Sequence, residues 1–323
     1  MVETDIKVIT FGAAVQDVFL MGKALQAKRD VRSHNYIEQF PLGAKVEIDE
    51  VHFDTGGGAT NAAVTFARQG FKVAFAGKVG RDPAGAEVLR VLHREGVSTE
   101  HVVYDNKLST SFSTLLVAPN GERTILNYRG ASHDLQTREF PIEQMKADWI
   151  YISSLAGNLS LLAAILKHAH KEGIKVALNP GARELAAASK LRKLLPYVEA
   201  LIANRDEMAL LFSAQDPREI MGKAFGICPF IVMTDGADGV YATDSLRVYH
   251  AGQYQKVRVV DRTGSGDAFG SGFVAALAKS GRIEDAITLG SANATSVVQF
   301  HGAKSGILKT DRIKAMKVKA ISL

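Results

Sequence analysis

Short apolar runs rich in β-branched residues alternate with longer segments of helical period along most of the chain. A strand-like run at residues 6–11 comes first, and strand and helix patterns then alternate between residues 56 and 96. The alternation returns at residue 148 and includes a strand-like run at 257–261 and a helix pattern at 283–300. Strands that alternate with helices are typical of parallel sheets with crossover connections. The pattern therefore predicts an α/β fold with a doubly wound, mostly parallel sheet flanked by helices.

Two stretches, at approximately residues 13–54 and 101–129, interrupt this alternation. Their residues favour strands and lack a helical period, and the second contains Pro119-Asn120-Gly121, which is typical of a hairpin turn. We expect the two stretches to pair as a small β-sheet apart from the main one, within a single domain spanning residues 1–323. Residues 21–38 fit either a loop or a short helix. A small open sheet exposes an edge, so this sheet could join two copies of the chain as a homodimer.

Composition excludes several classes of protein. The chain has 323 residues with 46% hydrophobic and 23% charged residues, which is ordinary for a globular protein. No apolar run reaches the roughly 20 residues of a membrane helix, and no signal peptide is recognisable at the beginning. The net charge of +5 is scattered without a basic stripe, which argues against nucleic acid as a partner. The single cysteine, Cys228, fits a reducing compartment, so we expect a cytoplasmic protein without a membrane partner.

The densest glycine cluster in the chain follows the strand-like run at 257–261. Residues 264–272 read GSGDAFGSG and lead into an apolar helix pattern. Backbone N–H groups at a helix start lack internal partners and attract anions, and glycine allows an anion to approach them closely. Asp267 beside this turn would repel a resting phosphate, but it is well placed to accept the proton of an attacking hydroxyl. The combination indicates transfer of a phosphoryl group to an alcohol.

Other glycine-rich and metal motifs fit the sequence less well. The spacing Gly264-x-Gly266-x-x-x-Gly270 is one residue longer than the dinucleotide fingerprint, and the acidic residue about 20 positions later, Asp285, lies in a helix pattern. The chain has no GxxxxGK[ST] loop and none of the HRD and DFG motifs of protein kinases. It also has no HExxH or paired-cysteine motif.

Two segments about 200 residues apart resemble the two signatures of the PfkB, or ribokinase-like, carbohydrate kinase family. DRTGSGDAFGSGF at residues 261–273 resembles the C-terminal signature, with its core D-[TR]-x-G-[AS]-G-D, and residues 55–97 resemble the N-terminal signature. The resemblance covers nearly the whole chain. It implies a ribokinase-like fold in which the small β-sheet is a lid. It also implies transfer of the γ-phosphoryl group of ATP, with Mg²⁺, to a sugar hydroxyl.

The resemblance also assigns roles around the phosphoryl group. Asp267 resembles the general base, and the backbone N–H groups of Gly264, Ser265 and Gly266 resemble the anion hole. Glu207 would act on Mg²⁺ through water. The implied nucleotide-binding residues are Asn179, Asn204, Thr234, Gly236, Gly239 and Asn293. Some relatives bind a monovalent cation such as K⁺, and the residues in the matching neighbourhood are Asp261, Thr263 and Gly302.

On the sugar side the resemblance implies binding by Asp17, Gly57, Gly58 and Asn61, and Arg129 could face an anionic group. The turn reads GGGATN where ribokinases usually read GGKGAN, so the chain lacks their lysine. Three alternatives therefore stay open. One is a nucleoside kinase whose base pocket is built from Phe19, Phe53, Phe112 and Tyr128. Another is a kinase for an acidic or phosphorylated sugar that uses Arg129 or Lys45. The third is a catalytically silent binding protein on the same fold.

Overall fold

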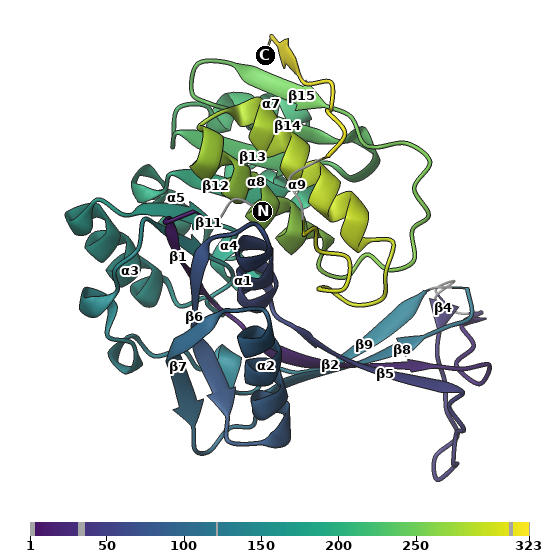
Figure 1. The fold of residues 1–323 in the computed structure, drawn as a ribbon. Helices are drawn as coiled ribbons and strands as arrows, with labels where there is room; N and C mark the ends of the chain where they lie inside the picture. The colour runs from purple at the N-terminus through teal and green to yellow at the C-terminus, as the bar shows by residue number, and fades with distance from the viewer. Residues whose placement is uncertain (1–3, 32–35, 121, 310–312, 323) are drawn as a thin grey trace.

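Helices cover both faces of a large, mostly parallel sheet, and a second sheet projects from its side (Figure 1). The computed structural model describes residues 4–31, 36–120, 122–309 and 313–322. Within these residues the main sheet has ten strands. From edge to edge they are β7 (Ser98–Asp105), β6 (Lys72–Gly80), β1 (Lys7–Phe11), β10 (Trp149–Ile152), β11 (Lys175–Leu178), β12 (Ala200–Asn204), β13 (Phe230–Thr234), β14 (Val240–Thr243), β15 (Val248–Ala251) and β16 (Lys319–Ile321).

The parallel part of the main sheet runs from β7 to β13, and β14, β15 and β16 continue it in antiparallel fashion. Its central strands are mostly apolar and buried, and all four residues of β10 are buried. Strands covered by helices on both faces have no solvent side, so their apolar runs are continuous rather than alternating. The expected strands at residues 6–11 and 72–80 are confirmed as β1 and β6.

Two hydrophobic cores lie on opposite faces of the main sheet, and each is closed by its own set of helices. One set consists of α1 (Gly58–Arg68), α2 (Pro83–Arg94), α8 (Ser265–Ser280) and α9 (Ile283–Val297). The other consists of α3 (Leu159–Glu172), α4 (Ala182–Leu185), α5 (Ala188–Arg192), α6 (Arg205–Phe212) and α7 (Pro217–Ala224). Short 3-10 turns lie at η1 (Ala131–His133), η2 (Thr137–Glu139), η3 (Ile142–Gln144), η4 (Leu195–Tyr197) and η5 (Gly236–Asp238). This arrangement is the predicted doubly wound sheet.

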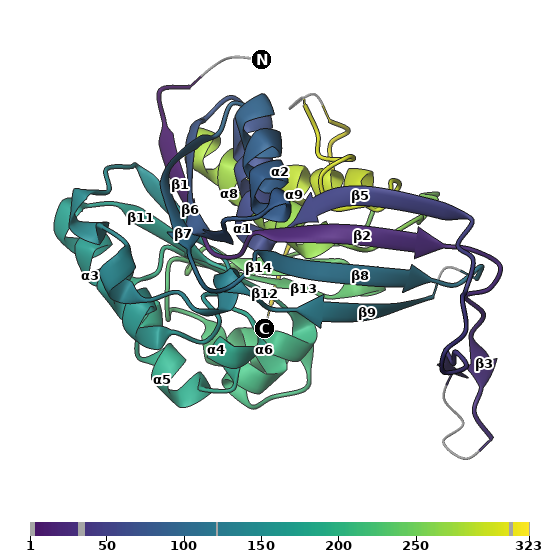
Figure 2. The same cartoon turned by 90° about the horizontal axis from the view of Figure 1, so that it is seen from below.

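Four strands form the projecting sheet, in the order β5 (Glu50–Gly56), β2 (Val15–Met21), β8 (Ser111–Val117) and β9 (Arg123–Tyr128). Figure 2 shows them extending away from the helical body. The expected hairpin is present between β8 and β9, although its turn residue Gly121 lies outside the described residues. Where described, residues 21–38 form no helix but a loop with a two-strand ladder, β3 (Lys28–Arg29) and β4 (Tyr36–Ile37).

Two expectations about strand positions were wrong. Residues 101–105, which the sequence assigned to the small sheet, belong to β7 and pair with β6 in the main sheet. Residues 257–261, expected as a strand, are irregular. The backbone N–H groups of Val260 and Asp261 donate to the carbonyl oxygen of Val298 at the end of α9, so this segment packs on a helix end rather than beside a strand. No described helix has the length and apolar character needed to cross a membrane.

Candidate active site

The glycine turn at residues 264–266 begins α8. Gly264 caps this helix with φ +74°, and a Cβ on it would lie 2.5 Å from the Cβ of Ala303. Glycine adopts this left-handed backbone without strain and also permits such a close contact. The amide of Ser265 donates to the carbonyl oxygen of Arg262 at 3.3 Å, a long bond that a stronger acceptor can replace. Backbone amides at a helix start of this kind can attract an anion.

Asp267 lies in the first turn of α8 and faces the beginning of α1. Its Oδ2 accepts a hydrogen bond of 2.8 Å from Nδ2 of Asn61. A Cβ on Gly58 would lie 3.0 Å from Oδ1 of Asp267 and 2.8 Å from Oγ of Ser153, so glycine at position 58 lets α1 approach the carboxylate. Burial raises the pKa of Asp267, while the hydrogen bond from Asn61 and the charge of Lys304 oppose the rise. A carboxylate with a raised pKa is a better proton acceptor than an ordinary one.

Lys304, for which no sequence pattern gave a signal, lies buried behind Asn61. Lys304 is only 4% exposed. The Nζ donates to Oδ1 of Asn61 at 2.7 Å, to Oγ1 of Thr60 at 2.9 Å and to the backbone oxygen of Thr55. Lysine is almost never fully buried unless it is paired. Here the pairing connects the end of β5 with the first turn of α1.

The charges of three carboxylates, Asp17, Asp54 and Asp267, act on the ammonium group of Lys304. Asp17 on β2 lies directly opposite Asp54 on β5 in the sheet register, and Asp267 approaches from α8. Burial raises the pKa of Asp17 to about 6, while Lys304 and a hydrogen bond from Ser113 oppose the rise. Burial lowers the pKa of Lys304 to about 8, against the attraction of the three carboxylates. Like charges opposite one another destabilise a sheet, so the lysine compensates for a pair that would otherwise be unfavourable.

The glycine turn before α1 lets Asp17 lie close to the backbone. A Cβ on Gly56 would lie 2.1 Å from Oδ2 of Asp17. Gly57 caps α1 with φ +97°, and a Cβ on it would meet the carbonyl oxygen of Ala13 at 2.3 Å. The structure thus brings together Asp17, Asn61 and the glycines of the predicted sugar side, next to Asp267.

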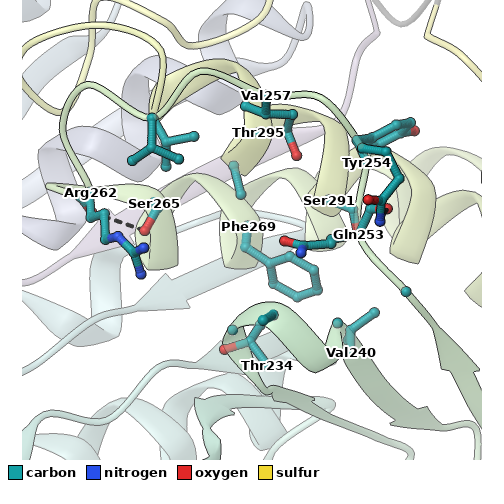
Figure 3. A pocket seen from close by; sticks show the side chains of 18 of the residues that line it. Thr234, Val240, Gln253, Tyr254, Val257, Arg262, Ser265, Phe269, Ser291 and Thr295 are labelled. Atoms are coloured by element: carbon teal, nitrogen blue, oxygen red, sulfur yellow. Dashed lines mark hydrogen bonds between the residues drawn. The ribbon is translucent and has the colours of Figure 1, made fainter.

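A cavity of about 530 Å³ lies on the other side of the first turn of α8. Thr234, Gly236 and Gly239, predicted as nucleotide-binding, line it together with Ser265 and Gly266. Figure 3 shows its wall, which also includes side chains that the sequence did not single out: Val240, Gln253, Tyr254, Val257, Arg262, Phe269, Ser291 and Thr295. Sequence reasoning missed most of these because they come from an irregular segment and from one face of α9. Apolar walls with a few polar groups are typical of a small-molecule pocket.

Asn204 and Glu207 form a reciprocal capping box at the start of α6. Oδ1 of Asn204 accepts from the Glu207 amide at 2.9 Å, and Oε2 of Glu207 accepts from the Asn204 amide at 2.9 Å. Burial raises the pKa of Glu207, and the neighbouring charge of Asp267 raises it further. Among the described residues no group of three or more His, Cys, Asp or Glu side chains could hold a metal ion. A Mg²⁺ ion here would depend on phosphate and water oxygens, with Glu207 beside it, which suits this ion.

Two predicted nucleotide residues have other partners in the structure. Asn179 follows β11, and its Nδ2 donates to the carbonyl oxygen of Ile202 at 2.8 Å, so it ties neighbouring strand ends together. Asn293 is 1% exposed and is not among the residues that line the cavity. Its amide bonds to the carbonyl oxygen of Ala268 and accepts from the Leu308 amide, both at 2.9 Å. It therefore joins α9 to α8 and to the tail.

Thr263 and Gly302, which were predicted to lie near a monovalent cation, both donate hydrogen bonds to the carboxylate of Asp261. Oδ1 of Asp261 accepts from Nη1 of Arg123 at 3.0 Å and from the hydroxyl of Thr263 at 2.8 Å. Oδ2 accepts from the Gly302 amide at 3.1 Å. Arg123, which the sequence did not single out, belongs to β9, so this contact connects the small sheet with the loop before α8. A cation held by backbone oxygens of these residues stays a prediction.

Arg129 lies at the end of β9 and is exposed. Burial lowers the pKa of His133, and the positive charges of Arg129 and Arg183 lower it further. Two guanidinium groups therefore lie near one imidazole, next to the small sheet. Arg129 and Lys45, the two residues predicted to face an acidic sugar, are both exposed.

Residues 17–310 match the family model described as pfkB family carbohydrate kinase. The chain is 28% identical over 263 residues to a ribokinase of Haemophilus influenzae, covering 78% of this chain and 83% of that protein. It is 31% identical over 247 residues to a fructokinase of Escherichia coli, covering 71% of this chain and 79% of that protein.

The fold is also found among solved structures. The nucleoside kinase of Methanocaldococcus jannaschii, an archaeal member of the ribokinase family, superposes with a TM-score of 0.76 at 18% identity, covering 94% of this chain and 95% of that one. At this identity the likeness concerns the fold alone. The predicted ribokinase-like fold is confirmed.

Proposed function

This chain belongs to the pfkB family of carbohydrate kinases, and on that premise we propose that it transfers the γ-phosphoryl group of ATP to a sugar hydroxyl, as ribokinases and fructokinases do. One observation carries the proposal. The first turn of α8 separates a cavity, lined by Ser265 and Gly266, from the carboxylate of Asp267, which faces Asn61. A phosphoryl group passing from the cavity to an acceptor beside Asp267 would cross the amides of this turn.

The cavity is the site proposed for the nucleotide. Its walls of Val240, Phe269 and Val298 suit an adenine ring, and Thr234 and Arg262 offer polar groups toward the phosphates. The phosphates would then lie against the start of α8, where unpaired amides and the helix dipole favour negative charge. These donors would stabilise the charge that spreads over the transferring group.

Asp267 is proposed as the general base. Oδ2 is held by Asn61, while Oδ1 lies at the open position created by Gly58. The acceptor hydroxyl would donate its proton to Oδ1 as its oxygen attacks phosphorus in line with the leaving ADP. Mg²⁺, beside Glu207, would neutralise phosphate charge when bound.

The residues proposed to hold the sugar are Asp17, Asn61 and the backbone of the turn at 56–58. The carboxylate can accept hydrogen bonds from sugar hydroxyls, and the amide can both accept and donate them. The small sheet, which carries Asp17 and Asp54, is proposed as a lid that excludes water from the phosphoryl group. The ion pair between Arg123 and Asp261 would hold it against the body.

A second candidate is a kinase for an acidic or phosphorylated sugar, favoured by the positive charges of Arg129 and Arg183 near His133. The structure favours a nucleoside as the acceptor less than it favours a sugar. Neighbouring residues of a strand point to opposite faces, so Phe53 and Phe112 point away from the face of Asp54 and Ser113. Phe19 shares that face but is buried at 2% exposure.

The test is ADP release measured over a panel of neutral sugars, sugar acids, sugar phosphates and nucleosides. Asp267→Asn should lower kcat at least ~1,000-fold while the KM for ATP changes little, because the variant keeps the turn but removes the base. Asp285→Asn, at an exposed carboxylate in the first turn of α9, is the matched control and should keep full turnover. The proposal would be overturned if no acceptor led to ADP release, or if the Asp267→Asn enzyme kept its turnover.

A further inference from the structure

A buried lysine reaches the proposed base through one intervening side chain. Nζ of Lys304 lies 2.7 Å from Oδ1 of Asn61, and Nδ2 of Asn61 lies 2.8 Å from Oδ2 of Asp267. The loop that carries Lys304 is itself fixed, because Arg68 donates to the carbonyl oxygens of Lys304 and Ile307 at 2.9 and 2.8 Å. Lysine, amide and carboxylate thus form a continuous row from the protein interior to the reaction centre.

The chemistry of the row fixes how the amide is turned. An asparagine side chain has one oxygen that accepts and one NH₂ group that donates. An ammonium group only donates, so it holds the oxygen of Asn61 toward Lys304. The NH₂ group must then point to Asp267, which as a carboxylate only accepts. Without Lys304 the amide could turn, and its oxygen would face the carboxylate and repel it.

The same ammonium group also touches the small sheet where it joins the body. Nζ donates to the backbone oxygen of Thr55, the next-to-last residue of β5, and to Oγ1 of Thr60 in α1. Asp17 and Asp54, which face each other on β2 and β5, also act on its charge. Lys304 therefore connects the strand that leads out of the small sheet with the residue that holds the base.

We infer that Lys304 is a positioning residue for phosphoryl transfer. Its ammonium group fixes the amide of Asn61, which holds Oδ2 of Asp267 and leaves Oδ1 directed at the acceptor hydroxyl. Its bond to Thr55 keeps this geometry in register with the small sheet. The inference rests on the proposed function, since it concerns how the proposed base is oriented. It assigns Lys304 to the chemical step, not to the binding of ATP.

The test is a double-mutant cycle on kcat. Lys304→Met keeps the length of the side chain and removes its donors, and it should lower kcat about 30- to 100-fold because a misaligned base reacts slowly. The KM for ATP should stay within about twofold. Asn61→Ala removes the group through which Lys304 acts. If the inference holds, the double variant Asn61→Ala/Lys304→Met is no slower than Asn61→Ala alone.

Lys78 provides the matched control. It is another buried lysine, 2% exposed, bonded to Asp105 and Glu139 and away from the base. Lys78→Met should reduce thermal stability and leave kcat close to wild type, which separates loss of a buried charge from loss of position. Lys304→Gln is the second variant, because its amide can still donate to Asn61. It should recover kcat to within about tenfold of wild type, and this recovery, with a KM for ATP within about twofold of wild type, is the measurement to use if Lys304→Met does not fold.

Two results would overturn the inference. One is wild-type kcat in Lys304→Met. The other is a double variant whose loss equals the product of the two single losses, which would mean that Lys304 acts independently of Asn61. A wild-type protein without turnover on any acceptor would instead remove the proposed function. Suppose that the wild-type protein turns over, Asp267→Asn is inactive and Lys304→Met is fully active. This combination would disprove the positioning role of Lys304 and leave the proposed function intact.

Discussion

The two sides of the first turn of α8 are built in different ways. The cavity side consists of backbone turns and mostly uncharged side chains from residues 234–298, which lie close together in the sequence; its charged lining residues are Lys256 and Arg262. The other side consists of charged groups from the beginning and the end of the described chain: Asp17, Asp54, Asp267 and Lys304. A nucleotide is bound by backbone amides and by a cavity of matching shape, whereas proton transfer requires charged groups at fixed positions. The difference suggests that substitutions on the two sides should alter different kinetic constants.

The charged side also reduces stability. Asp17 and Asp54 are opposite each other and desolvated, and burial raises the pKa of both. The cavity side carries no comparable group among its lining residues, where Arg262 and Lys256 are exposed. Active sites commonly retain such unfavourable groups because function requires them. The following three substitutions test whether the two sides are separable.

The largest effect is expected for Gly58→Ala. The new Cβ would lie 3.0 Å from Oδ1 of Asp267 and 2.8 Å from Oγ of Ser153, so the carboxylate must shift. We expect kcat to fall about 100-fold, because small displacements of a reacting group have large kinetic effects. The KM for ATP should be nearly unchanged, as measured by steady-state kinetics. Gly222→Ala, at a site with no atom within 4 Å of the new Cβ, is the control. An equal rise in the KM for ATP would show that the sides are not separable.

A smaller effect is expected from filling the cavity with Thr295→Phe. Thr295 lies on α9 and lines the cavity (Figure 3). A ring at this position should raise the KM for ATP about tenfold through overpacking, with kcat at saturating ATP close to wild type. Nucleotide titration by calorimetry would measure the same loss directly. Unchanged nucleotide affinity would argue that the donor binds elsewhere.

The third prediction concerns the stability of Asp17→Asn. The pKa of Asp17 is raised from 3.8 to about 6 in the folded protein, so the folded state binds the proton more tightly than the unfolded state. The penalty for ionising it is absent below about pH 4, grows as the pH rises to 6, and is complete above that. The variant should therefore be more stable at pH 8 by up to about 3 kcal/mol.

Denaturant unfolding of both proteins at pH 8 and pH 4 would measure this difference. The gain in the free energy of unfolding should disappear at the lower pH. The same variant should bind the acceptor more weakly, because it loses a carboxylate that faces it. A variant that is less stable than wild type at pH 8 would show that Lys304 compensates fully for the charge of Asp17.

The sequence predicted the parts of the molecule that depend on local backbone chemistry. The glycine turn at 264–266 and the helix that follows it are both encoded by neighbouring residues. Its errors occurred where distant contacts override local preference. Residues 257–261 have the β-branched composition of a strand, but their amides bond to the end of α9 instead. Asn293 looked like a helix-surface or ligand residue, and the fold buries it between α8, α9 and the tail.

By itself, the sequence determined the alternation of strands and helices, the glycine turns and the carboxylate beside the second of them. These depend on torsion preferences and on spacing along a few residues, so the pattern records them directly. Only the tertiary structure decided which charges meet. Asp17, Asn61, Asp267 and Lys304 are separated by up to 287 positions in the chain, and they converge because parallel crossovers bring the same ends of distant elements to one edge of the sheet. The sequence alone gives no sign that Lys304 is buried, because its partners Thr55, Thr60 and Asn61 come from distant elements.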